Sequence, residues 1–213
     1  EYDVKWSYNQ RNRTVKLSLK QKQDLKNNLF KMPVQVRVDD QIHMIWIEDK
    51  ELVYELPVDM RPKLVIFNAE MRIPCKVTFN KTVSEWIIQL EKGPHILDRI
   101  AAIQVLKTKK GRRSVETALL NAAKSDPFWG VRKEAVNAFA NLKSKKYADE
   151  LMALAEGQDN RVRRAIWNGL KNYKDNEDVS LFLQNVILSD NKYYSISDAF
   201  KSLVVVDTSA ARK

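Results

Sequence analysis

The sequence predicts an α+β multidomain protein in which a small β-sandwich is followed by an α-α superhelix of helical repeats. Apolar residues alternate with period two through the first eighty residues, and the period changes to that of helices after Thr82. Large apolar residues then recur at intervals of 33, 31 and 33, at Leu106, Phe139, Leu170 and Leu203, as in a helical repeat array. We therefore place a β-sandwich domain at residues 1–82 and a helical repeat domain at residues 83–213.

Seven short strands are expected in the first domain. Alternation predicts strands near residues 4–8, 15–19, 34–38 and 52–56, and further strands are expected at 41–47, 63–67 and 75–79. Pro33, Pro57, Pro62 and Pro74 fall at segment ends, where a missing N–H does not interrupt a ladder. Strands of this number and length are typical of a small sandwich.

Eight amphipathic helices are expected in the second domain. We place them at residues 83–91, 95–107, 114–124, 129–142, 146–157, 160–173, 176–188 and 192–206. Glycine and proline or aspartate turns separate them, as at Gly111, Asp126-Pro127 and Gly157. No single hairpin can bury its own apolar stripe, so the four hairpins should stack on one another.

The two clearest repeats begin with an aspartate turn. Asp126 precedes Val131-Arg132, Asp159 precedes Val162-Arg163, and small and apolar residues follow each pair at helical spacing. This pattern resembles HEAT repeats, which present surface as scaffolds and rarely perform chemistry alone. We interpret Arg132 and Arg163 as structural residues that bridge to Asp126 or Asp159 of the same or the next helix. Binding of substrate by these arginines is the alternative.

Catalytic and metal-binding patterns are missing from the sequence. His43 is expected to point out of the sheet and His95 to lie at the start of a helix, and no HExxH or other paired-histidine ligand set surrounds them. Cys75 is expected in a strand of the core, and no Gly-x-Ser-x-Gly elbow or glycine-rich phosphate loop occurs. We predict no catalytic, cofactor-binding or metal-binding residue in these 213 residues. The compartment stays open, since one cysteine does not decide it.

Basic residues follow the repeated helices, and the repeat would bring them to one edge. The formal charge of +10 is otherwise spread, with +4 in residues 1–82 and +6 in residues 83–213. The basic residues are Lys107, Lys109, Lys110, Arg112, Arg113, Lys143, Lys145, Lys146, Lys171 and Lys174. Cations at helix C-termini complement the macrodipole, which is the structural interpretation. The functional alternative is an edge that binds an acidic protein, a phospholipid surface or nucleic acid. No aromatic residues interleave with these cations, which argues against nucleic acid.

Several stretches together resemble the C-terminal region of the aminopeptidase N family of zinc metallopeptidases. The first is Val4-Lys-Trp-Ser-Tyr8 followed by Val15-Lys-Leu-Ser-Leu-Lys-Gln-Lys-Gln23, and the next is Phe30-Lys-Met-Pro-Val34. Later stretches are Lys63-Leu-Val-Ile-Phe-Asn68, Val77-Thr-Phe-Asn-Lys81, Glu85-Trp-Ile-Ile-Gln-Leu90 and Arg99-Ile-Ala-Ala-Ile103. Their order and spacing, over essentially the whole chain, carry the resemblance.

The resemblance implies a parent enzyme that removes N-terminal residues from peptides. Its upstream catalytic domain would hold zinc with HExxH and a more distant glutamate, and a Gly-x-Met-Glu-Asn segment would recognise the free amino terminus. None of that domain's motifs occurs in this sequence, so no catalytic residue can be assigned here, and zinc is expected only in the parent. The partners implied are the upstream domain of the same polypeptide and the peptide substrate, without a membrane span. A second hypothesis is an inactive relative, or a HEAT-repeat adaptor that binds a protein partner. Binding of nucleic acid through the basic edge is a third, weaker hypothesis.

Overall fold

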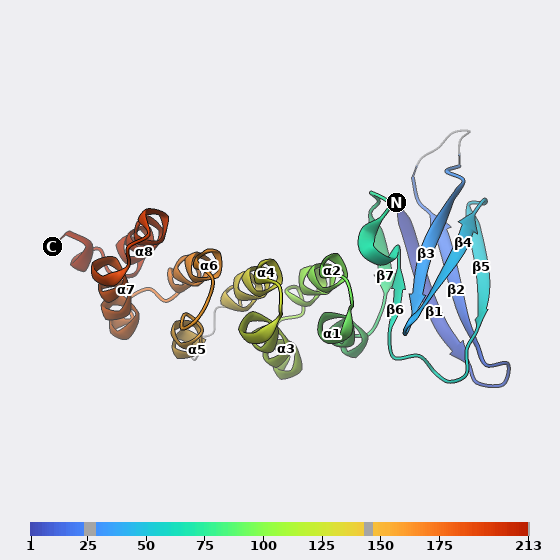
Figure 1. The fold of residues 1–213 in the computed structure, drawn as a ribbon, viewed down its shortest axis with the longest axis horizontal. Coiled ribbons are helices and arrows are strands. Elements are labelled where there is room, and N and C mark those ends of the chain that lie inside the picture. Colours follow the sequence, from blue (N-terminus) through green and yellow to red (C-terminus); the bar gives the residue numbers. More distant parts are fainter. Residues whose placement is uncertain (24–28, 143–146, 213) are drawn as a thin grey trace. The chain divides into compact units, whose positions relative to one another are not determined.

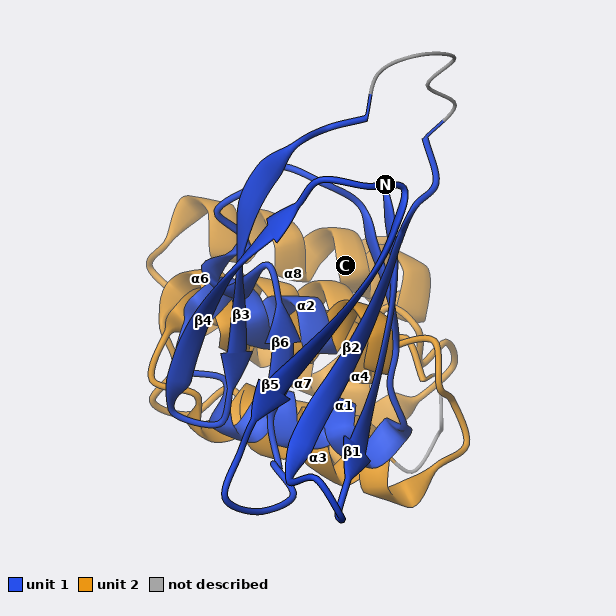
Figure 2. Cartoon of the chain, turned by 90° about the vertical axis from the view of Figure 1, so that its right-hand side faces the viewer, with its two compact units in different colours: residues 1–102 blue, residues 103–213 orange. Residues whose placement is uncertain are grey.

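The computed structural model describes residues 1–23, 29–142 and 147–212 (Figure 1). The chain divides into two compact units, residues 1–102 and 103–213 (Figure 2). Along the chain, the last strand ends at Asn80 and the first helix begins at Val83. The boundary between the two units falls later, between Ala102 and Ile103 of the helix Ile96–Leu106. Among the described residues, no helix is both long enough and apolar enough to cross a bilayer.

The first unit holds two sheets. Its strands are β1 (Tyr2–Asn9), β2 (Thr14–Gln21), β3 (Met32–Val38), β4 (Gln41–Ile47), β5 (Glu51–Pro57), β6 (Val65–Phe67) and β7 (Val77–Asn80). One sheet has the order β5-β2-β1-β7, with β7 parallel to β1, and the other has the order β4-β3-β6. All seven predicted strands are present, so the predicted sandwich is confirmed.

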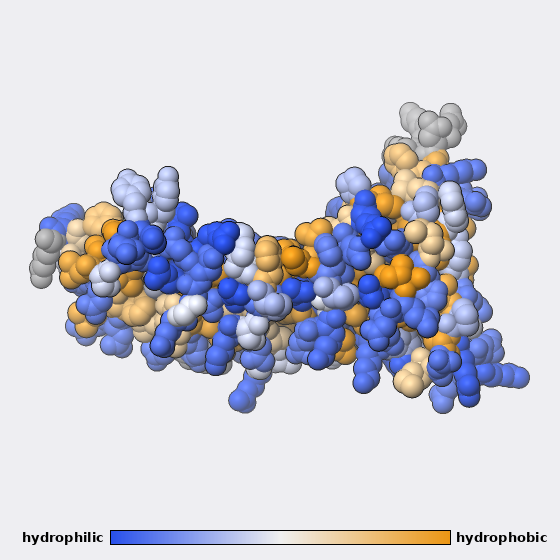
Figure 3. Space-filling model, viewed as in Figure 1, coloured by the Kyte–Doolittle hydropathy of each residue, from blue (hydrophilic) through white to orange (hydrophobic). Residues whose placement is uncertain are grey.

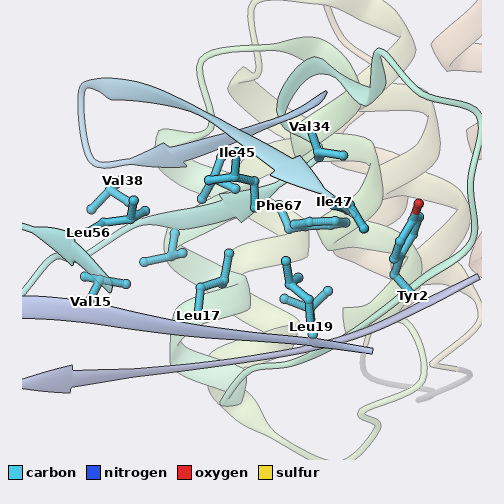
Figure 4. Packing of buried hydrophobic residues seen from close by; sticks show 13 residues of the cluster. Tyr2, Val15, Leu17, Leu19, Val34, Val38, Ile45, Ile47, Leu56 and Phe67 are labelled. Carbon is cyan, nitrogen blue, oxygen red and sulfur yellow. The ribbon is translucent and has the colours of Figure 1, made fainter. Parts of the chain in front are cut away.

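The core of the sandwich is formed by the inward-facing residues of both sheets. Val34, Val38, Ile45, Ile47 and Phe67 come from β3, β4 and β6, and they face side chains of β1, β2 and β5 (Figure 4). Successive side chains of a strand point to opposite faces, which is why the period-two alternation located β1, β2, β3 and β5. Pro33 lies opposite Trp46 in the pairing of β3 with β4, which is the end of the strand expected for a proline.

Two residues of the first unit differ from their predicted placement. His43 shares a face with Ile45 and Ile47, so it points toward the core side of β4, while its neighbours Ile42 and Met44 are exposed. Apolar residues occupy both faces of this strand, and the alternation therefore could not tell which face is buried. Cys75 precedes β7 and does not lie within it, although it packs against the sandwich core as predicted. Burial raises the pKa of its thiol.

Eight helices follow the strands in the described part of the chain. They are α1 (Val83–Lys92), α2 (Ile96–Leu106), α3 (Arg113–Ser125), α4 (Trp129–Ala140), α5 (Ala148–Ala153), α6 (Asn160–Leu170), α7 (Glu177–Ser189) and α8 (Tyr193–Val206). Thr82 caps α1 in a reciprocal capping box with Glu85. His95 directly precedes α2, and its Nδ1 accepts a hydrogen bond from the Leu97 N–H at 3.3 Å, as expected for the start of a helix.

Three helical hairpins stack in the second unit. In Figure 1, α4, α6 and α8 follow one another in a row, each paired with the preceding helix α3, α5 or α7. The residues with the predicted spacing, Leu106, Phe139, Leu170 and Leu203, are all buried. The helix α5 is shorter than predicted, because the chain leaves the helix at Leu154 and turns through Gly157, whose φ is +68°. This turn carries Gln158 back toward the preceding hairpin.

Candidate functional site

Arg132 of α4 joins the turn before its own helix to the next hairpin. Its NH1 group donates to the main-chain oxygen of Asp126 at 2.7 Å, and its Nε donates to Oε1 of Gln158 at 2.8 Å. The amide of Gln158 in turn points toward the carbonyl of Lys124 at the end of α3, at 3.4 Å. Arg132 therefore contacts Asp126 through the main-chain carbonyl of the turn.

Arg163 occupies the equivalent position in α6. Its NH2 group lies 3.4 Å from Oδ2 of Asp190, the aspartate that precedes the next repeated helix. Asp190 also accepts hydrogen bonds from the Ser195 hydroxyl at 2.6 Å and from the Lys192 N–H at 3.0 Å. The repeat thus brings the arginine of one hairpin to the aspartate of the following one. The structural role of these arginines stays a prediction.

Asp159 is bound mainly within its own turn. It caps α6 by accepting from the Arg161 N–H at 2.8 Å, and both carboxylate oxygens accept from the Arg161 guanidinium at 2.9 Å. These hydrogen bonds hold the pKa of Asp159 well below its usual range. The Arg161 side chain is exposed and that of Asp159 is partly exposed, so the pair adds little to stability. Its effect is to fix the orientation of the Arg161 guanidinium.

The structure also places aromatic rings beside arginines at the start of α4, α6 and α8, which the sequence did not reveal. The Arg161 guanidinium carbon lies 3.6 Å from the centre of the Trp129 ring. Arg164 lies over Tyr194 at 5.3 Å and pairs with Asp198 at 2.6 Å. Cation–π contacts of this kind fix side chains that would otherwise be mobile. The repeat spacing of 31 to 33 residues could have suggested that these segments of neighbouring hairpins lie close together. It could not have shown which side chains turn toward each other.

The predicted basic edge is only partly described. Lys143, Lys145 and Lys146 lie outside the described residues. Four cations, Lys107, Lys109, Lys110 and Arg112, lie in the connection between α2 and α3, and a fifth, Arg113, is the first residue of α3. All five are exposed. Lys171 and Lys174 follow α6 and are also exposed. Hydrophilic side chains cover much of the helical repeats on the face shown in Figure 3.

A cavity of about 420 Å³ lies between the last two hairpins. Arg163 and Trp167 of α6 line it on one side, and Val186, Ser189 and Asp190 at the end of α7 line it on the other. Trp167 is buried, and its indole N–H donates to Ser195 at 2.8 Å. Its walls therefore combine an arginine, a carboxylate and an aromatic side chain.

Metal-binding side chains do not come together in the described part of the molecule. Within residues 1–23, 29–142 and 147–212, no group of three or more histidine, cysteine, aspartate or glutamate residues could hold a metal ion. The described residues therefore do not fit a zinc site, and we derive no chemical step through a metal for this chain.

Comparison with known proteins connects this architecture to two groups. Residues 116–203 match the family model of HEAT repeats. The chain is similar in structure to a crystal structure of Legionella pneumophila aminopeptidase A in complex with aspartic acid, with a TM-score of 0.53 and 13% sequence identity. That likeness covers 99% of this chain and 28% of the Legionella protein, so the chain spans under a third of its length. No curated protein matches the sequence. The helical repeats and the fold of the whole chain are thus shown.

Proposed function

We propose that this chain is the non-catalytic C-terminal part of a zinc aminopeptidase of the aminopeptidase N family. The observation that carries the proposal is the order of two unrelated architectures, a sandwich and then helical repeats, shared with an aminopeptidase structure over 99% of the chain. The residue stretches that resemble the family support the same assignment independently of the fold. Fold alone does not fix activity, so the two arguments have to be taken together.

In this proposal the parent enzyme removes N-terminal residues from peptides, and zinc held by an upstream catalytic domain supplies the Lewis acid. The 213-residue chain contributes part of the surface of the catalytic chamber. Its helical array encloses the catalytic chamber and limits which peptides reach it. Stacked hairpins suit this role because each packs on its neighbours and together they form an extended wall.

The test uses the full polypeptide that contains this sequence. It should hydrolyse aminoacyl p-nitroanilides, and a zinc chelator should abolish the turnover. The 213-residue chain alone should show neither turnover nor stoichiometric zinc. A full polypeptide that turns over no aminoacyl substrate under any metal condition would contradict the proposal and favour a HEAT-repeat adaptor that binds a protein partner.

The enclosing role needs a second readout. If the helical array limits access, destabilising it should change the dependence of the full enzyme on peptide length more than its activity on aminoacyl anilides. Anilides are small, and a loosened wall should affect them little. An equal effect on long peptides and anilides would show that the array supports the catalytic domain without selecting substrates.

A further inference from the structure

Strand β4 forms an edge of its sheet, and three of its residues offer main-chain groups to a further strand. Among the described residues, β4 pairs with β3 alone (Figure 2). A two-residue turn joins these strands, so their first pair, Val38 and Gln41, is hydrogen-bonded. Hydrogen-bonded pairs alternate along an antiparallel ladder, so the N–H and C=O groups of Ile42, Met44 and Trp46 point away from β3.

One hydrogen bond agrees with this direction. The Trp46 carbonyl accepts from the hydroxyl of Tyr54, which belongs to β5 in the other sheet. The outward groups of Ile42 and Met44 have no hydrogen-bond partner within the described residues. Natural proteins usually block such an edge with a lysine, a proline or a bulge. The sequence of β4 has no charge and no proline, and its register with β3 is continuous.

The side chains of the same three residues form an exposed apolar stripe on the outer face of the sheet. Ile42 is 41% exposed, and Met44 and Trp46 are each 55% exposed. On the same face, Ile66 of β6 is buried in a cluster against which Ile88 of α1 packs. The covering of this face by α1 therefore does not extend to β4.

Acidic residues flank the apolar stripe at both ends. Asp40 and Glu48 stand two positions beyond Ile42 and Trp46, and both are exposed. Between Arg37 and Lys50 the sequence has four acidic residues and no lysine or arginine, although the whole chain has a formal charge of +10. The edge is thus apolar in its middle and negative at its two ends.

A second copy of the chain does not suit this edge. Antiparallel pairing of two β4 strands about Met44 would align their apolar stripes, but it would also place Asp40 of each copy opposite Glu48 of the other. Like charges directly opposite each other destabilise a sheet. The same acidic ends attract a strand that carries cations at these positions.

We propose that β4 binds an extended segment of a partner protein by β-strand addition. The segment has apolar side chains at alternate positions, which pack on the apolar stripe, and a lysine or arginine beyond each end, which pairs with Asp40 or Glu48. Main-chain hydrogen bonds to Ile42 and Met44 provide affinity, and the alternate side chains provide specificity. The site does not rest on the aminopeptidase assignment, because the whole edge belongs to this chain.

The test is a titration of the 213-residue chain with two capped peptides, followed by NMR. Acetyl-Lys-Thr-Val-Thr-Val-Thr-Val-Thr-Lys-amide should bind saturably and should protect the amide protons of Ile42 and Met44 from exchange with solvent. The same peptide with glutamate at both ends should bind about tenfold more weakly, since two opposite-charge pairs become like-charge pairs. Absence of protection, or equal binding of the two peptides, would overturn the proposal.

Two variants with the same added charge locate the site. Met44→Lys interrupts the apolar stripe and should weaken binding of the lysine peptide at least tenfold. Val53→Lys places the same charge at an exposed position of β5, the edge strand of the other sheet, and should leave binding unchanged. Unchanged binding by Met44→Lys would overturn the proposal. A dimer of the free chain that Met44→Lys dissociates would also overturn it, because β4 would then pair with a second copy.

Reversal of the charges gives a result that unfolding cannot imitate. The double variant Asp40→Lys with Glu48→Lys should bind the glutamate peptide about tenfold more tightly than the lysine peptide, which is the opposite of the wild-type order. The protected amide protons should still be those of Ile42 and Met44. A double variant that keeps the wild-type order would show that the ends of β4 do not select the partner, and the proposal would fail.

Discussion

At the scale of single residues, Arg132 links consecutive hairpins through hydrogen bonds to Asp126 and Gln158. Arg132→Ala removes a charged donor and leaves a turn carbonyl and an amide without their partner. We expect a loss of about 1–3 kcal/mol in the free energy of unfolding, measured as a melting temperature lower by several degrees. Arg161→Ala is the comparison, because it removes an ion pair with Asp159 and a cation–π contact with Trp129 near the surface, and it should lower the melting temperature less than Arg132→Ala does. If Arg132→Ala left the melting temperature unchanged, Arg132 would have no structural role in the repeat.

Lys81 is a second residue with a measurable property. Its ammonium lies 4.5 Å from the centre of the Phe79 ring and 4.7 Å from that of Trp86, and Nζ donates to Gln89 Oε1 at 2.5 Å. Burial lowers the pKa of Lys81 to about 7, although Glu85 and Asp98 oppose the shift. The pKa is lower in the folded state than in the unfolded state, so between about pH 7 and pH 10 the unfolded chain binds more protons. The contribution of Lys81 to the free energy of unfolding therefore becomes more favourable as the pH rises through this range.

Lys81→Met tests the shifted pKa, because methionine keeps much of the apolar stem but cannot be protonated. Below pH 7 the wild type carries the full cost of a buried charge, and this cost disappears as the pH rises toward 10. The melting temperature of Lys81→Met relative to wild type should therefore be highest near pH 6 and should decrease by pH 9.5. A difference that stays constant over this range would show that Lys81 titrates normally.

The residue scale is also where the sequence predicted least. The recurrence of Arg132 and Arg163 followed from the repeat, but their partners Gln158 and Asp190 lie in turns whose conformation no periodicity describes. The stacking of Arg161 on Trp129 depends on the Asp159 cap, which orients the guanidinium. Such contacts join residues about 30 positions apart, and single-sequence patterns report only local spacing.

At the scale of elements, periodicity predicted all seven strands and eight helices, with ends displaced by a few residues. The exceptions have local causes. The chain leaves α5 early to carry Gln158 back to Arg132, and Cys75 falls just before β7 because that strand begins at Val77. The expected outward placement of His43 was wrong, since Ile42, Met44 and Trp46 are exposed and His43 shares the core face of β4.

Close packing between α4 and α6 gives a prediction at this scale. A Cβ atom added at Gly169 would lie 2.8 Å from the Cβ of Ala140, which is fixed to the α4 backbone and cannot move away alone. Gly169→Ala gains about 1 kcal/mol of helix propensity but overpacks the contact at a cost of about 1–3 kcal/mol. We expect net destabilisation of about 1 kcal/mol in urea unfolding.

The double variant Ala140→Gly with Gly169→Ala is the matched control. It moves one methyl group from α4 to α6 and relieves the close contact. The effect of Gly169→Ala should therefore be more favourable in the Ala140→Gly background than in the wild type, which a double-mutant cycle measures. Additive effects of the two changes would show that the helices separate to accept the methyl group without strain.

At the scale of the whole molecule, the sequence predicted both architectures and their order, because two different apolar periods meet near Thr82. The structural likeness to an aminopeptidase extends over nearly the entire chain at 13% identity, which is a property of fold. The cavity lined by Arg163, Trp167 and Asp190 could not be predicted, since it depends on which side chains of α6 and α7 turn toward each other. The proposed aminopeptidase activity therefore has to be tested on the full polypeptide.

The reading frame upstream of Glu1 is the sharpest test of the proposed aminopeptidase assignment. Sequencing it should reveal an HExxH motif, a glutamate further downstream that completes the zinc ligands, and a Gly-x-Met-Glu-Asn segment that recognises the free amino terminus of a peptide. Such a frame would make this chain the wall of an aminopeptidase chamber. A start codon directly before Glu1 would contradict the aminopeptidase assignment, and so would an upstream catalytic domain without its zinc ligands. Either result would favour a scaffold that binds a protein partner.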